Sequence, residues 1–94
     1  MDTVVLGRKF FMRYVAAVLY KLFVEGKRRA IVRGYGRRNV YRAVLVATSV
    51  MHLVKEARIT RAETFTTMLT EPDTGKQRYI PGIEIELSLI DYTP

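Results

Sequence analysis

Apolar residues follow two different spacings in the first half of the chain. Residues 3–6 form a short run rich in β-branched side chains that stops at Gly7, which predicts a buried strand. Between Phe10 and Glu25 the apolar positions recur at helical spacing and predict a helix with one buried face. That face comprises Phe11, Met12, Val15, Ala16, Val18, Leu19, Leu22 and Phe23. A second short apolar run at residues 30–32 predicts another strand.

A second helix is predicted from Val40 to Lys55, and it is apolar around more of its circumference than one core requires. Its apolar positions cover an arc of roughly 180°, whereas a helix on one core needs about 100°. Leu45 lies outside even the wider arc. The surplus apolar surface predicts that this helix also packs on a second surface. The simplest candidate for that surface is another copy of the chain. The predicted dimer interface consists of Leu45, Val46, Ser49, Leu53 and Val54.

The last third of the chain has an extended pattern. Residues 59–69 are rich in Thr, Ile and Phe, residues 71–76 carry a turn signal, and residues 83–89 alternate apolar with polar. This pattern predicts a long hairpin whose tip projects at about residues 70–80. The element order βαβαββ predicts an α/β fold: a two-layer sandwich of two helices and a mixed four-stranded sheet. We expect residues 1–94 to form a single domain.

Charge is distributed unevenly and points to a polyanionic partner. The formal net charge is +7 with a sequence pI of about 10.1. Residues 1–46 carry eleven Lys and Arg against only Asp2 and Glu25. A basic half of this kind favours nucleic acid or another anionic surface as the partner.

Composition argues against several other classes of function. The chain has no Cys and a single His, His52, and its sequence contains no cluster of acids. We therefore expect no enzyme, no cofactor, no metal site and no small-molecule substrate. The longest apolar segment, residues 15–24, is too short to span a bilayer, so no membrane association is expected. No signal peptide is visible at the N-terminus, and we expect a soluble intracellular protein.

Two glycine-containing basic segments precede the two predicted helices. The first is Gly7-Arg8-Lys9, and the second runs from Arg33 to Asn39 as a predicted loop. Glycine lets backbone amides approach a phosphate, and a helix start adds a positive dipole end. Cations at a helix start are unfavourable without an anion partner, which favours phosphate binding.

Several residues of these segments have an alternative, purely structural interpretation. Asn39 is as suited to capping the second helix as to binding phosphate. Gly34 and Gly36 either allow the backbone geometry of a turn or let a phosphate approach the backbone closely. Tyr35 either stacks on a base or packs on its neighbours. The hairpin tip around Lys76 either is a solvated turn or contacts a groove or the backbone of a nucleic acid.

Two stretches of the sequence resemble the Alba family of archaeal chromatin proteins. Residues 4–15 (Val-Val-Leu-Gly-Arg-Lys-Phe-Phe-Met-Arg-Tyr-Val) follow the family pattern of a short apolar strand, Gly, two bases and a helix containing Met-x-Tyr-Val. Residues 31–44 are similar to the family's second strand, glycine-basic segment and helix start. Phe10 replaces the usual Pro, and the second glycine segment is one residue longer, as in a divergent paralogue. Phe10 itself is expected in the core or at an interface.

The resemblance implies a fold similar to the C-terminal domain of bacterial translation initiation factor three. It implies a homodimer or a heterodimer with a paralogue that binds double-stranded DNA without sequence preference and compacts and bridges it, often binding RNA as well. It places the central DNA contact at Arg8 and Lys9, with Lys9 as the possible acetylation site. It also implies a location in the cytoplasm, on the chromosome.

The predicted nucleic-acid-binding surface combines both basic segments with the hairpin tip. Its residues are Arg8, Lys9, Arg13, Gly34, Tyr35, Gly36, Arg37, Arg38, Asn39, Arg42, Lys76, Gln77 and Arg78. Phosphate contact serves DNA and RNA alike. A primarily RNA-binding protein, either a ribonucleoprotein subunit or an RNA chaperone, is therefore the alternative.

Overall fold

The computed structural model describes residues 2–90, and its elements follow the order predicted from the sequence. They are β1 (Thr3–Val5), α1 (Phe11–Leu19), the π-helical turn η1 (Tyr20–Val24), β2 (Arg29–Tyr35), α2 (Arg37–Leu53), β3 (Ala57–Thr70) and β4 (Gln77–Leu89). The four strands form one open sheet in the order β1-β2-β4-β3. The predicted α/β class and βαβαββ order are confirmed.

The sheet mixes parallel and antiparallel pairs. Strand β1 runs parallel to β2, with Thr3 opposite Ile31 and Val5 opposite Arg33. Strand β4 is antiparallel to both β2 and β3 and occupies the middle of the sheet. The connection between parallel β1 and β2 passes through α1, as parallel pairs require a crossover.

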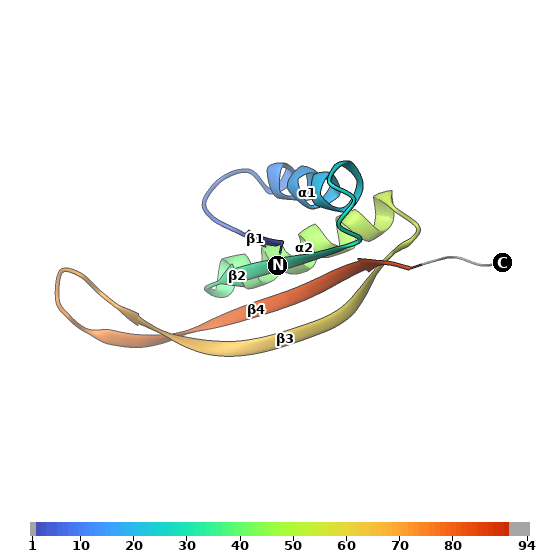
Figure 1. The fold of residues 1–94 in the computed structure, drawn as a ribbon. Coiled ribbons are helices and arrows are strands. Elements are labelled where there is room, and N and C mark those ends of the chain that lie inside the picture. Colours follow the sequence, from blue (N-terminus) through green and yellow to red (C-terminus); the bar gives the residue numbers. More distant parts are fainter. Residues whose placement is uncertain (1, 91–94) are drawn as a thin grey trace.

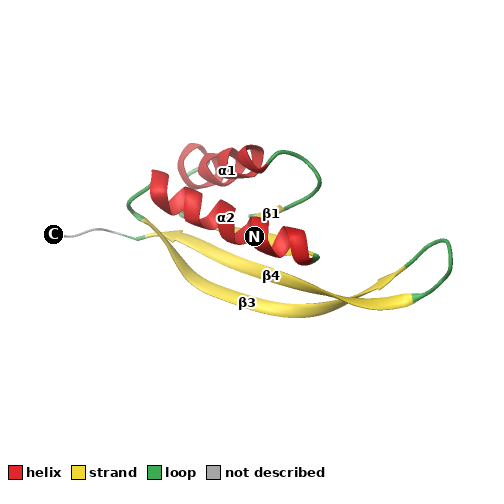
Figure 2. Cartoon of the chain, turned by 180° about the vertical axis from the view of Figure 1, so that it is seen from behind, coloured by secondary structure: helices red, strands yellow, loops and turns green. Residues whose placement is uncertain are grey.

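Both helices lie against one face of the sheet, as Figures 1 and 2 show from opposite sides. Alternate residues of β2 and β4 point toward the helices, and Val32, Ile85 and Leu87 are buried there. From α2, Val46 and Val50 fill the space between helix and sheet. No helix within residues 2–90 is long and apolar enough to cross a membrane.

The buried stripe of α1 is narrower than its sequence predicts. Val15, Val18 and Leu22 are buried, but Met12 and Phe23 are largely exposed. Helix α1 ends in η1, and the wider π-helical turn shifts the angular position of the residues that follow. Phe10 precedes the first turn of α1 and is 87% exposed, which excludes the core and leaves an interface as its predicted place.

Strand β2 and helix α2 together occupy the segment that the sequence predicts as a loop. Strand β2 extends to Tyr35, and α2 begins at Arg37, three residues before the predicted start at Val40. Only Gly36 remains between them, with a φ of 88° that favours glycine. The basic residues that follow Gly36 therefore lie on a helix, where their Cα positions are fixed.

The hairpin of β3 and β4 extends well beyond the rest of the sheet (Figure 1). Strand β2 pairs with β4 only as far as Gly82, whereas β3 and β4 continue to pair to Thr70 and Gln77. The turn is closed by a 2.8 Å hydrogen bond from the Glu71 N–H to the Lys76 carbonyl. The projecting ribbon gives the molecule extents of 56 × 22 × 21 Å.

Candidate nucleic-acid interface

The Gly7 loop is attached to both helices by hydrogen bonds. The backbone N–H of Gly7 donates to the Tyr14 hydroxyl at 2.7 Å, and Arg42 Nη1 of α2 donates to the Gly7 carbonyl at 3.2 Å. These bonds fix the loop that carries Arg8 and Lys9 beside the first turns of α2. The two basic segments, about thirty residues apart in sequence, therefore become neighbours.

A depression forms where the two segments meet. It has a volume of about 320 Å³ and is lined by Gly7, Arg8, Arg38, Asn39 and Arg42. A broader adjoining hollow of about 780 Å³ shares Arg8 and Arg42. Its other lining residues are Lys9, Phe10, Phe11 and Arg13. We call Gly7, Arg8, Lys9, Arg38 and Arg42 the loop–helix cluster.

The loop–helix cluster is strongly electropositive. Neither α1 nor α2 has an acidic residue in its first turn, and neither start is capped by a side chain. Among residues 2–90, no carboxylate forms an ion pair with Arg8, Lys9 or Arg38. Uncompensated guanidinium groups at a helix start fit an external phosphate, which accepts paired hydrogen bonds from arginine.

Three residues predicted to bind phosphate or a base make contacts within the chain, in line with their alternative structural interpretation. Gly34 is buried, and a Cβ there would lie 2.7 Å from the Asn39 carbonyl carbon, so it allows β2 and α2 to pack closely. The Gly36 N–H donates to the Pro81 carbonyl at 2.8 Å and is not available to a phosphate. Tyr35 packs edge-on against Phe65, with ring centroids 5.7 Å apart.

Asn39 does not have the capping role that was one of its two predicted roles. It lies in the first turn of α2 rather than at the cap, which is Gly36. Its Nδ2 donates to the Tyr35 carbonyl at 3.1 Å and joins the helix to the end of β2. Its Oδ1 is buried without a hydrogen-bond partner in the described chain. Asn39 therefore lines the depression while its side-chain amide donates within the chain.

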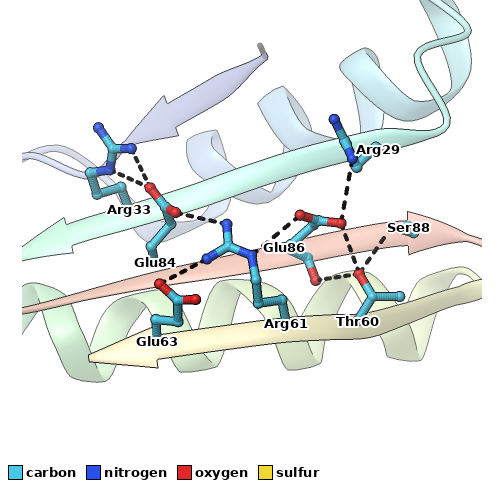
Figure 3. A network of polar contacts seen from close by, with 8 residues as sticks. All are labelled: Arg29, Arg33, Thr60, Arg61, Glu63, Glu84, Glu86 and Ser88. Atoms are coloured by element: carbon cyan, nitrogen blue, oxygen red, sulfur yellow. Dashed lines mark hydrogen bonds and ion pairs between the residues drawn. The ribbon is translucent and has the colours of Figure 1, made fainter. Parts of the chain in front are cut away.

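The sheet face away from the helices carries charges that neutralise each other (Figure 3). Glu84 accepts hydrogen bonds from Arg33 and from Arg61, the latter at 2.7 Å, and Arg61 also pairs with Glu63 and Glu86. These hydrogen bonds, led by that from Arg61, lower the pKa of Glu84 and raise those of both arginines. Because its cations are paired, this face is a poor polyanion site.

The hairpin tip is less basic than its sequence indicates. Lys76 and Arg78 share the tip with Glu71 and Asp73, so its formal charge is zero. Arg78 Nε lies 3.8 Å from Glu71 Oε1. This pairing was not predicted from the sequence, although residues on either side of a turn are obvious candidates for contact. In Figure 1 the tip projects beyond the end of the body where the loop after β1 and the start of α2 lie.

Two members of the predicted dimer interface lie in the core of the chain itself. Val46 is fully buried and Val54 is 7% exposed, so neither offers surface to a second copy. The structure leaves Leu53 strongly exposed, at 60%. Ser49 and Leu53 line a groove between α1 and α2 together with Met12. The error arose because a helical wheel cannot distinguish which part of a wide apolar arc faces the sheet.

The fold and the loop–helix cluster define a small α/β protein with exposed cations gathered at two helix starts. Alba from Thermoplasma volcanium has a similar structure, with a TM-score of 0.82 and 27% identity over 93% of this chain and 99% of that one. ALBA1 from Trypanosoma brucei shares the fold at a TM-score of 0.69 and 18% identity, over 96% of this chain and 70% of that one. These likenesses support an Alba-family protein.

Comparison of the sequence alone is less informative. No protein-family model matches this chain, and no curated protein matches it.

Proposed function

We propose that this protein binds double-stranded DNA without sequence preference, through the loop–helix cluster. The observation that carries the proposal is the convergence of Arg8, Arg38 and Arg42 on one depression beside Gly7. Three guanidinium groups around a space of about 320 Å³ suit a phosphate group rather than a base. The proposed role is binding rather than catalysis.

Phosphate contact explains why the binding would not depend on sequence. Phosphate oxygens are the same at every nucleotide, so contacts to them position a protein without reading bases. Lys9 and Arg13 border the broader hollow and extend the cationic surface along α1. Arg37 is exposed in the first turn of α2 and extends the surface on the other side.

Compaction and bridging of DNA require more than one such surface in the assembly. We propose a dimer, with a second copy or a paralogue, whose two loop–helix clusters hold neighbouring stretches of duplex. The exposed Leu53 and the adjoining groove between α1 and α2 support an interface there. The complex would act on the chromosome, in the cytoplasm, and acetylation of Lys9 would remove one cation from it.

The salt dependence of duplex binding tests the proposal. The logarithm of the affinity should fall linearly with the logarithm of the salt concentration, with about −0.9 in slope for each phosphate contacted. Arg38→Ala should make the slope shallower by about 0.9. Lys55→Ala removes an exposed cation beyond the other end of α2 and serves as the matched control. A slope near zero, or equal effects of the two variants, would refute the proposal.

RNA is the alternative target because the cluster contacts would serve either polymer. Competition between a duplex DNA and a structured RNA of equal length, at matched salt, separates the two. Preferential release of the DNA by the RNA would assign the protein to RNA instead.

A further inference from the structure

The projecting hairpin carries an aromatic side chain that is largely exposed. Tyr79 of β4 lies opposite Met68 of β3, and the two side chains are 70% and 47% exposed. Alternation along each strand puts Gln77 and Thr70, the next pair toward the turn, on the same face as Tyr79 and Met68. That face therefore carries no charged side chain at these two pairs.

The charges around this face do not support a purely electrostatic contact. Arg78 points to the opposite face of the ribbon and pairs with Glu71. Asp73 and Glu71 both belong to the turn. Two carboxylates at the leading edge oppose deep insertion of the turn between the phosphate rows of a duplex groove.

We propose that Tyr79, supported by Met68, is a stacking platform for an unpaired base of single-stranded nucleic acid. The inference rests on the proposed function, because the loop–helix cluster would hold the backbone of the same polymer. A base exposes a flat π-face when it is unpaired, and aromatic side chains bind that face with little dependence on sequence. Gln77 lies on the same face and offers an amide to the edge of the base.

A base fits this face better than a protein partner does. Tyr79 and Met68 alone offer far less area than the roughly 800 Å² per partner of a stable protein interface. A tyrosine ring and a base are of similar size, and Lys76 beside the platform supplies a cation for the adjoining phosphate. The ribbon would therefore select unpaired segments, while the cluster binds any phosphate backbone.

Affinity measurements on Tyr79→Ala test the platform. The probes are a 20-nucleotide single-stranded oligothymidine and a 20-base-pair duplex of mixed sequence. Tyr79→Ala should weaken single-strand binding by about 5- to 100-fold and leave its salt slope unchanged, because a stacked base is neutral. Duplex binding should change by less than about 3-fold. Tyr20→Ala removes an exposed tyrosine from the body and should change neither.

A fluorescence measurement tests the contact directly. The chain has no Trp, so Tyr79→Trp introduces a single reporter on the platform, and Tyr20→Trp introduces one in the body. Oligothymidine should quench the reporter at 79 and not that at 20. Absence of selective quenching, or equal loss of single-strand and duplex affinity in Tyr79→Ala, overturns the platform. Neither result bears on the proposed duplex site, which depends on the effect of Arg38→Ala.

Discussion

The loop–helix cluster and the hairpin tip contain the same kinds of cation, but the structure gives them different surroundings. Arg8 and Arg38 lie at helix starts that lack carboxylates, and Arg42 anchors their loop. Arg78, in contrast, stands across a turn from Glu71 and is paired with it. The difference shows that a basic sequence motif predicts a polyanion site only when its cations lack intramolecular partners.

The two regions also differ in how firmly they are held. The cluster rests on two helices packed over a buried core, and its loop is bonded to Tyr14 and Arg42. Beyond Pro81, whose carbonyl still accepts from the Gly36 N–H, the hairpin is a two-stranded ribbon whose strands pair only with each other. A fixed array suits simultaneous phosphate contacts, whereas a ribbon suits a local contact with one nucleotide.

Charge reversal in the cluster should have the largest effect on binding. Arg8→Glu combined with Arg38→Glu should weaken duplex binding on the order of 100-fold or more, because two charge-assisted contacts are lost and replaced by repulsion. Both side chains are exposed, so the thermal midpoint should change little. Titration of a labelled duplex measures the affinity.

The charge-matched comparison is Lys76→Glu combined with Arg78→Glu. It changes the net charge by the same amount, but we expect less than about a 10-fold loss, because Arg78 is already paired. Equal losses from the two double variants would mean that total charge, rather than its placement, determines binding.

The close packing beneath the cluster should be the next most sensitive feature. Gly34→Ala should lower the free energy of unfolding by about 1–3 kcal/mol, because its Cβ would meet the backbone of Asn39. In Gly82→Ala the added Cβ meets only the ring of Phe65. That ring can rotate away, which should lower the free energy of unfolding by about 0.5–1.5 kcal/mol. Urea denaturation of both variants measures the difference, and an equal or smaller cost at Gly34 would contradict this account.

The elements of the fold were predictable because their patterns are strong and local. Alternation at residues 83–89 and the turn signal at residues 71–76 predicted the hairpin, and helical spacing predicted both helices. The boundaries near Gly36 were not predictable, because strand pairing with β4 extends β2 through Gly34 and Tyr35. Their glycine-rich composition indicates a loop when pairing partners are unknown.

The candidate site was predictable by residue type but not by role. The bases of both glycine segments were recognised from their positions before helices. Their convergence depends on the hydrogen bond from Arg42 to Gly7, a contact between residues 35 apart that no local pattern contains. The pairing of Arg33 with Glu84 likewise depends on the register between β2 and β4.

The charge network on the outer face should affect stability without affecting binding. Hydrogen bonds from Arg61 and Arg33 lower the pKa of Glu84 in the folded protein, below its ordinary value of 4.5. The contribution of Glu84 to the free energy of unfolding is therefore fully present above pH 4.5 and is lost as the pH falls through the pKa of the folded state. Glu84→Gln should lower the thermal midpoint by a few degrees at pH 7.

The pH dependence of the thermal midpoint provides a control for the Glu84→Gln variant. The difference in thermal midpoint between the native protein and Glu84→Gln should shrink as the pH falls below 4.5. Duplex affinity at pH 7 should be the same for both, because the network lies on the face away from the helices. Weaker duplex binding in Glu84→Gln would show that this face takes part in the interface.

The smallest expected effect is the release of Arg78 from its partner. Glu71→Gln removes the paired carboxylate and keeps an oxygen for the Thr74 hydroxyl, which donates to Glu71 Oε2 at 3.3 Å. Duplex affinity at low salt should rise about 2- to 3-fold, and the salt slope should steepen by up to about 0.9 as Arg78 gains a phosphate. Asp73→Asn removes the same charge from the turn without freeing Arg78. A larger gain in duplex affinity from Glu71→Gln than from Asp73→Asn would show that pairing with Glu71 keeps Arg78 from binding the duplex. Equal gains would show that the net charge of the turn limits duplex binding by the hairpin.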